Sequence, residues 1–260
     1  MNSSTGRDPH QCLRAISGPR AKMAQNIPMI YFLGDTHGKF QHVIDAVHHG
    51  RPDAVVFLGD IQARQPLDLE LACIAEMTDI WFVHGNHDTD SDTSYANLFE
   101  SKFAHRNLHG RIAEVAGLRI AGLGGVFRGQ VWMPPAHWKY EQPADFAACC
   151  GAGNLWRNGL PRKHRSTIFP SDCFGLLQER ADILVTHEAP SAHPHGFTII
   201  DELARSLGVS KSFHGHHHDR RDYRSHTRRL GFEAFGVGLR GITDGRGRVV
   251  RAGDCDTTPA

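Results

Sequence analysis

The chain has 260 residues, a formal net charge of +1 at pH 7 and 40% hydrophobic residues. This length predicts one substantial domain, and the near-zero charge gives no bulk attraction to nucleic acids or membranes. No apolar run could span a bilayer, residues 1–26 lack a secretory signal core, and the cysteines form no C-x-x-C pair. We therefore expect a cytoplasmic protein without a membrane partner. We expect tails at residues 1–26 and 253–260 around a single domain at 27–252.

Short apolar runs alternate with amphipathic segments over the first part of this domain. The runs at 29–33, 54–58 and 80–83 are continuously apolar, which is typical of strands buried on both faces of a parallel sheet. Apolar residues at helical spacing predict helices over about 39–49 and 66–77. This order indicates an α/β domain, in which ligands bind at the carboxyl ends of the strands.

The second part of the chain begins with two short strands, predicted as antiparallel, at 111–115 and 118–121. Residues 128–170 then show weak periodicity and contain a basic segment at 157–165. A long irregular segment in a compact domain is usually functional or disordered. We interpret this insert either as a lid that recognises substrate or as a solvated loop. A strand at 183–185, a helix at about 197–207 and several short strands to about 251 complete the domain.

Five motifs rich in metal ligands occur in series, and four of them directly follow buried apolar runs. They are Gly34-Asp35-Thr36-His37-Gly38, Gly59-Asp60, Gly85-Asn86-His87-Asp88, Thr186-His187-Glu188 and Gly215-His216-His217-His218. Carboxylate oxygen, imidazole nitrogen and amide oxygen are ligands that divalent cations accept in proteins. Alone, Asp60 would suit a turn or a helix cap, and His187 would suit a hydrogen-bonded core position. The series predicts a metal site at the ends of parallel strands.

Two metal ions about 3.5–4 Å apart can share a bridging carboxylate and a bridging hydroxide, whose pKa they lower. Beside Asp35, the natural bridging carboxylate is Asp60. The alternate residues His216 and His218 face the same side of an extended segment, and His217 faces the other way. These positions predict a metal-dependent hydrolase.

The motif around Asn86 adds acid–base chemistry to this site. Asn86 offers a neutral amide oxygen to a metal ion. His87 can protonate a leaving alkoxide, and we expect Asp88 to fix the tautomer of His87 and to raise its basicity.

Together, these motifs resemble the calcineurin-like metallophosphoesterases over about residues 29–220. The resemblance implies an α/β fold, a four-layer αββα sandwich of two mixed β-sheets flanked by helices. It also implies two divalent or trivalent metal ions, manganese in the first place, with iron or zinc as alternatives. It assigns Asp35, His37 and His218 to one ion, Asn86, His187 and His216 to the other, Asp60 to both, and His87 with Asp88 to catalysis.

Arg64 lies four residues after Asp60 and is similar to an arginine that grips phosphate in protein serine/threonine phosphatases and diadenosine tetraphosphatases. A guanidinium suits that bidentate contact. However, Ala63 and His84 stand where the protein phosphatases have an Asp and a further Arg, and the motif ending in His218 resembles the phosphodiesterase branch. Arg64 is therefore either a substrate-binding residue or an exposed arginine at the start of a helix. Monoesterase and diesterase activities both stay open.

The first functional hypothesis is hydrolysis of a small phosphoester by attack of a metal-bridging hydroxide, with His87 as the general acid. A protein phosphatase is less favoured, because the short chain leaves little room to dock a peptide. A nuclease would require a basic groove and steep salt dependence, so the near-neutral charge does not favour a nucleic-acid partner. A non-catalytic interaction module on this fold would usually lack some of the ligands or His87, and all of them are present.

Overall fold

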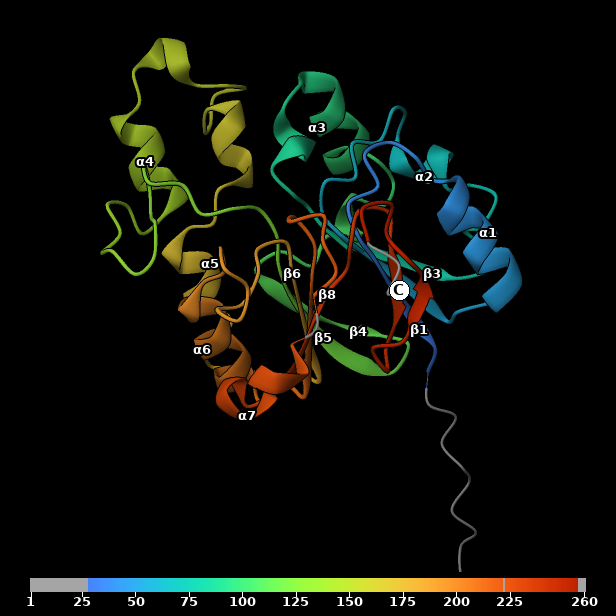
Figure 1. The fold of residues 1–260 in the computed structure, drawn as a ribbon. Helices are drawn as coiled ribbons and strands as arrows, with labels where there is room; N and C mark the ends of the chain where they lie inside the picture. Colours follow the sequence, from blue (N-terminus) through green and yellow to red (C-terminus); the bar gives the residue numbers. More distant parts are fainter. Residues whose placement is uncertain (1–27, 222, 257–260) are drawn as a thin grey trace, which may run out of the picture.

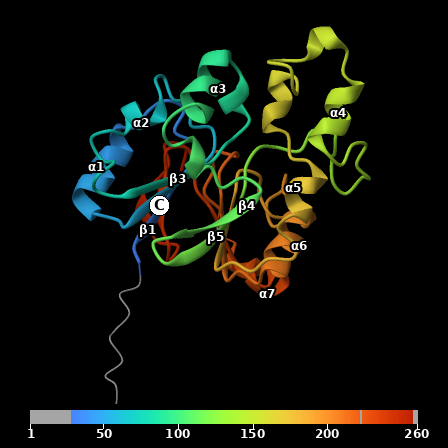
Figure 2. The same ribbon diagram turned by 180° about the vertical axis from the view of Figure 1, so that it is seen from behind.

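The computed structural model describes residues 28–256 except residue 222. Two five-stranded sheets pack face to face and helices cover their outer faces, so the chain forms a four-layer α/β sandwich (Figures 1 and 2). The α/β character expected from the sequence pattern and the two-sheet sandwich implied by the family resemblance are both confirmed. The predicted tail at 1–26 lies outside the described residues, as do the last four residues of the predicted tail at 253–260.

The first sheet contains the three apolar runs that precede the first three metal motifs. In spatial order its strands are β10 (Val249–Arg251), β9 (Ile242–Asp244), β1 (Ile30–Leu33), β2 (Ala54–Leu58) and β3 (Asp79–Val83). Strands β1, β2 and β3 are parallel, and β9 pairs antiparallel with both β1 and β10. Three helices, α1 (Gln41–Gly50), α2 (Leu67–Glu70) and α3 (Asp92–Phe99), lie on this side of the molecule.

The second sheet carries the last two metal motifs. In spatial order its strands are β4 (Arg111–Val115), β5 (Leu118–Leu123), β6 (Ile183–Thr186), β7 (Lys211–His214) and β8 (Glu233–Gly236). Strands β5 to β8 are parallel, and β4 pairs antiparallel with β5, as predicted. Helices α5 (Pro170–Phe174), α6 (Thr198–Leu207) and α7 (Thr227–Leu230) lie on the other side of the sandwich (Figure 1).

The core between the two sheets holds the strand ends in place. Phe32 of β1 and Phe213 of β7 stack with their ring centroids 3.8 Å apart and their planes 8° from parallel. Both rings are fully buried, and Val56 and Val185 belong to the same apolar cluster. This contact joins the two sheets through the strands that lead into the first and last metal motifs, so the loops after them lie at one edge of the sandwich.

The helix predicted over 66–77 is shorter than expected. Regular α-helical structure ends at Glu70, and the N–H groups of Ile74 and Met77 bond to carbonyl oxygens three residues earlier, at 3.0 and 2.9 Å. Such bonds make tighter turns than those of an α-helix. Leu71 and Ile74 are nevertheless fully buried, so the apolar spacing predicted the buried face but not the helix length.

The insert at 128–170 is irregular along much of its length and contains α4 (Pro143–Cys149). Figure 1 shows α4 on the side of the molecule opposite α1. The insert reaches α3 through Trp156, whose ring centroid lies 4.7 Å from that of Tyr95. None of the helices between residues 28 and 256 is long and apolar enough to cross a bilayer.

Replacing Phe32 with Ala should lower the free energy of unfolding by about 3–5 kcal/mol, because a fully buried phenyl group is lost and a cavity remains. Urea unfolding followed by circular dichroism measures this change. Phe174→Ala is the matched control, because that side chain is 36% exposed and should cost much less. Equal losses in the two variants would contradict the role given to the stacked ring pair.

Candidate metal centre

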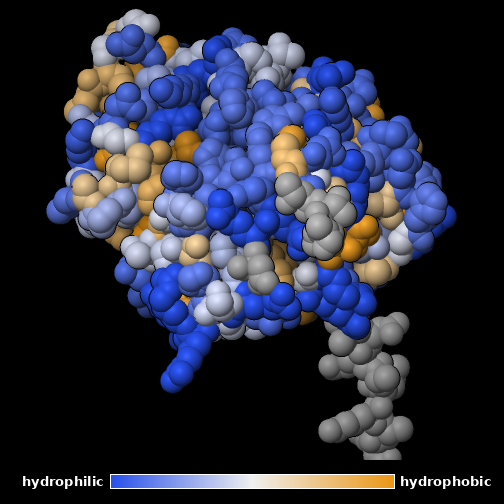
Figure 3. Space-filling model, viewed as in Figure 1, coloured by the Kyte–Doolittle hydropathy of each residue, from blue (hydrophilic) through white to orange (hydrophobic). Residues whose placement is uncertain are grey.

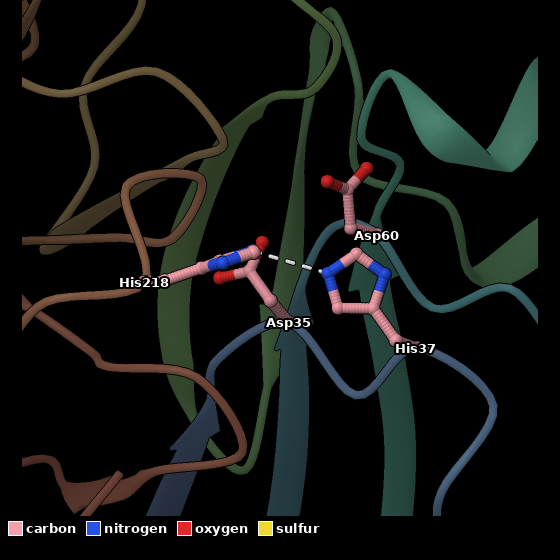
Figure 4. Close-up of side chains that lie close together, drawn as sticks. All are labelled: Asp35, His37, Asp60 and His218. Carbon is pink, nitrogen blue, oxygen red and sulfur yellow. Dashed lines mark hydrogen bonds between the residues drawn. The ribbon is translucent and has the colours of Figure 1, made fainter. Parts of the chain in front are cut away.

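A first group of candidate metal ligands gathers where β1, β2 and β7 end. Asp35, His37, Asp60 and His218 each place one ligand atom within 4.8 Å of the others, and Figure 4 shows their side chains converging. The Nε2 atoms of His37 and His218 are 3.1 Å apart. Asp35 and Asp60 are almost completely buried. Two carboxylates and two imidazoles in this arrangement suit a divalent cation.

The tautomer of His37 is set by a neighbour that the sequence analysis did not single out. Nδ1 of His37 lies 2.6 Å from Oε1 of Gln62, and that oxygen can only accept a hydrogen bond. Nδ1 therefore carries the proton, and the lone pair of Nε2 faces the ligand group. Hydrogen bonds of this kind orient histidine ligands in metalloproteins.

A second group shares Asp60 with the first. It consists of Asp60, His187 and His216. Nδ1 of His187 donates to the carbonyl oxygen of Leu58 at 2.7 Å, so Nε2 is directed toward Oδ2 of Asp60 at 3.5 Å and Oδ1 of Asn86 at 3.3 Å. Asp60 therefore occupies the position that a bridging carboxylate would need. The structure thus brings together all seven residues predicted as metal ligands.

The backbone around these ligands is strained. Five of the ten non-glycine residues with positive φ in the described part of the chain lie at this centre. They are His37 (φ 44°), Asp60 (47°), Gln62 (47°), His216 (73°) and His218 (61°). Such conformations cost free energy and cluster at functional sites. Their concentration indicates that ligand geometry takes priority over local backbone preference here.

Close contact of loops also requires glycine beside the ligands. Gly59 has a φ of 102°, and a Cβ atom on it would lie 2.2 Å from Nδ1 of His187. A Cβ on Gly85 would lie 2.2 Å from Oδ1 of Asp60. Any larger residue at either position would displace a ligand.

The buried carboxylates repel one another. Burial, the largest influence, together with the charge of Asp60, raises the pKa of Asp35 to about 7, although His187 opposes the shift. Burial also acts to raise the pKa of Asp60, but the attraction of His187 and the backbone N–H of His87 outweigh it, so the Asp60 pKa lies below its ordinary value. The centre therefore concentrates negative charge that needs a cation nearby.

His187 responds to the same charge. Burial alone lowers its pKa, but the carboxylates of Asp60 and Asp35 outweigh burial and raise the pKa of His187 to about 10. The negative charge of these carboxylates therefore favours a cation at this position. The ligand types and their charge thus fit metal ions, which would supply that positive charge.

The residue beside His87 differs from the one that we predicted. Both carboxylate oxygens of Asp88 accept backbone hydrogen bonds, from Gln62 at 2.7 Å and from Gly85 at 2.8 Å. Nδ1 of His87 instead lies 2.5 Å from Oδ2 of Asp90. The orienting position that we expected Asp88 to hold therefore belongs to Asp90, three residues after His87. Asp88 fixes the loop that carries His87.

His87 stands at the surface of the centre. Its side chain is 45% exposed. Its backbone N–H donates to Oδ1 of Asp60 at 2.8 Å, which ties the loop to the candidate ligand groups. Burial lowers the pKa of His87, but the hydrogen bond with Asp90 and the charge of Asp60 outweigh it and leave the pKa raised. The imidazole is thus accessible to solvent beside the predicted ligands.

Arg64 lies at the rim near His37. A Cβ atom on Gly38 would be 3.1 Å from Nε of Arg64, so the guanidinium stem covers the loop after β1. The side chain is exposed and has no hydrogen-bond or carboxylate partner among the described residues. The contact places Arg64 against the loop that carries His37, but its exposure also fits the alternative of a surface arginine.

Much of the basic segment at 157–165 pairs within the protein. Arg157 contacts the carboxylate of Glu100, and Arg162 contacts that of Asp92. Arg162 also donates to the carbonyl oxygens of Thr89 at 3.2 Å and Asp90 at 2.8 Å. Arg162 therefore holds the loop that carries His87, a role that the sequence analysis did not predict.

Two face-to-face sheets with Asp and His groups that could bind metal at their strand ends define the metallophosphoesterase fold class. The chain belongs to the calcineurin-like phosphoesterase family, whose sequence model matches residues 28–220. It is 41% identical over 219 residues to an uncharacterized protein of Haemophilus influenzae, across 84% of this chain and 95% of that protein.

A solved structure shares the same fold. The protein TT1561 of Thermus thermophilus superposes with a TM-score of 0.54 over 87% of this chain and 99% of its own, at 14% sequence identity. The family model and the relative from Haemophilus influenzae confirm the family resemblance inferred from the five motifs, and this superposition agrees with the fold that it implied. At this level of identity the likeness to the solved structure concerns the fold alone.

Gly59→Ala should reduce manganese binding by at least about tenfold, because the added methyl group collides with a ring whose orientation neighbouring hydrogen bonds fix. Titration calorimetry with manganese measures this loss. Gly117→Ala is the matched control, because Gly117 also has a positive φ (81°) but a Cβ there meets nothing within 4 Å. Equal manganese affinity in the two variants would contradict the expected displacement of His187 by a side chain at position 59.

Proposed function

We propose that this protein hydrolyses a small-molecule phosphoester with the help of two metal ions. The proposal rests on one arrangement: two ligand groups share the buried Asp60, and the accessible His87 lies directly beside them. Membership of the calcineurin-like phosphoesterase family supports hydrolysis of phosphoesters. The substrate within that class is part of the proposal.

In this proposal Asp35, His37 and His218 hold one ion, Asn86, His187 and His216 hold the other, and Asp60 contacts both. Two bound ions would supply an activated water near neutral pH and would offset charge on the phosphoryl oxygens. Manganese is the first candidate, with iron and zinc as alternatives. Gln62 and the carbonyl group of Leu58 keep the two histidines that they contact in the tautomer that metal binding needs.

His87 is proposed as the general acid for the leaving group. Its Nδ1 is engaged by Asp90, so Nε2 is the nitrogen that can deliver a proton to the departing oxygen. Asp88 is proposed as a residue that positions the His87 loop, through the backbone groups of Gln62 and Gly85. Arg64 is proposed to contact the substrate phosphate from the rim.

The other hypotheses receive less support. Figure 3 shows a largely hydrophilic surface on one face of the molecule, without a large continuous apolar area for a protein partner. Arg157 and Arg162 of the insert are paired with carboxylates, which weakens the argument for a basic nucleic-acid groove. An interaction module would not require seven converging ligands beside an accessible histidine.

Manganese-reconstituted protein should hydrolyse para-nitrophenyl phosphate or bis-para-nitrophenyl phosphate. With an alkyl phosphate, whose alkoxide leaving group must be protonated, His87→Ala should lower kcat by about 100- to 10,000-fold because this proton donor is lost, and the bound metal measured by mass spectrometry should not change. Preference between the two esters separates the monoesterase hypothesis from the diesterase hypothesis. Absence of turnover of both esters by protein that holds two metal ions would contradict the proposal.

The two aspartates near His87 should have separable effects. Asp90→Ala should lower kcat roughly tenfold or more, because His87 loses its orienting partner, and manganese affinity should hardly change. Asp88→Asn should lower the free energy of unfolding by about 1–3 kcal/mol, because an amide cannot accept both backbone hydrogen bonds. Kinetics and urea unfolding of both variants test this division. A reversed pattern would return the orienting role to Asp88.

A further inference from the structure

Arg128 begins the insert and reaches the loop that carries His87. Its Nη2 donates to Oγ of Ser166 at 3.3 Å, and that oxygen lies 2.8 Å from Oγ1 of Thr89. Thr89 is two residues after His87 and belongs to the same 3₁₀ turn, His87–Thr89. The guanidinium of Arg128 is thus joined to the catalytic side of the centre through a short chain of hydroxyl groups.

Most of the hydrogen-bonding capacity of Arg128 is unused. Its Nε and Nη1 atoms are shielded from solvent and have no hydrogen-bond partner among residues 28–256. No carboxylate in the described part of the chain forms an ion pair with it, whereas Arg157 and Arg162 of the same insert are paired. Buried charged donors without partners are costly. We expect a protein to keep such unpartnered donors where a bound ligand supplies the missing hydrogen-bond acceptor.

Carboxylates of the candidate centre and its surroundings act on the charge of this guanidinium. Burial lowers the pKa of Arg128, while the negative charges of Asp90, Glu188 and Asp60 act in the opposite direction. Oε1 of Glu188 also accepts the N–H of Phe127 at 3.1 Å, which fixes the backbone next to Arg128. The residue therefore sits on the second-sheet side of the centre, whereas Arg64 covers the β1 loop of the first sheet.

We propose that Arg128 binds an anionic oxygen of the substrate phosphoryl group. This inference rests on the proposed phosphoesterase function. A planar guanidinium matches the geometry of phosphate oxygens, and the nitrogens left unused by Ser166 supply the donors. A cation in addition to the metal ions favours a dianionic monoester over a monoanionic diester. Arg128 therefore directs the site toward a terminal phosphoryl group.

Arg128→Gln tests this role in full-length protein reconstituted with manganese. The Kd for inorganic phosphate, measured by titration calorimetry, should rise about 10- to 100-fold, because a charged hydrogen bond is lost. The KM for para-nitrophenyl phosphate should rise more than the KM for bis-para-nitrophenyl phosphate. Lys163→Gln is the matched control, because it removes one positive charge from an exposed position in the same insert and should leave both constants within about twofold of wild type.

A second variant covers the case in which Arg128→Gln unfolds. Arg128→Lys keeps the charge but lacks the planar fork, so the phosphate Kd should still rise several-fold. Unchanged phosphate affinity in folded, metal-loaded Arg128→Lys or Arg128→Gln would overturn the inference, even if the melting temperature fell. Wild-type protein with two bound metal ions that neither binds phosphate nor hydrolyses either ester would overturn the proposed function itself. If the wild-type protein hydrolyses an ester but the Arg128 variants bind phosphate as tightly as wild type, only the inference about Arg128 is overturned.

Discussion

The buried charge of Asp60 is the constraint on which the rest of the site depends. This carboxylate is 1% exposed and belongs to both ligand groups. It can stay ionised there because His187 and the N–H of His87 face it. The same charge raises the pKa values of the neighbouring carboxyl groups of Asp35 and Asp88, which burial already shifts upward, to about 7. Metal ions would relieve this repulsion, and an apolar replacement of Asp60 would remove the feature that joins the two groups.

Packing of the two sheets stabilises the fold against the unfavourable free energy of these buried charges. The ligands come from loops at one edge of two sheets, and the stacked Phe32 and Phe213 lock those sheets together. Positive φ angles at His37, His216 and His218 carry local strain that the packed strands beneath must offset. The packed strands thus supply the stabilising free energy that offsets this strain, and the short loops set the orientation of the candidate ligand side chains. This division explains why the site can be precise although none of its ligands lies within a strand.

The sequence predicted which side chains lie together where their positions depend on the ends of parallel strands. Apolar runs followed by Asp, Asn or His predicted which side chains meet, because parallel strands end at a common edge. Sequence reasoning failed for Gln62, Asp90 and Arg162, whose contacts depend on turn conformation and on the packing of the insert. An acidic residue three positions after His87 was a usable signal, since that spacing places two side chains together in a helical turn. For Gln62 no such local signal exists.

In the proposed function, the insert would link substrate recognition to the orientation of His87. Arg162 holds the carbonyl groups of Thr89 and Asp90, and Arg128 reaches Thr89 through Ser166. Asp90 in turn contacts His87. A phosphoryl group bound by Arg128 would therefore be coupled, through the hydrogen bonds of Ser166 and Thr89, to the turn that carries the proposed proton donor His87. All seven candidate metal ligands lie in loops of the two sheets, outside the insert, so in the proposed function the insert is the part of the chain that would adapt the site to a particular phosphoester.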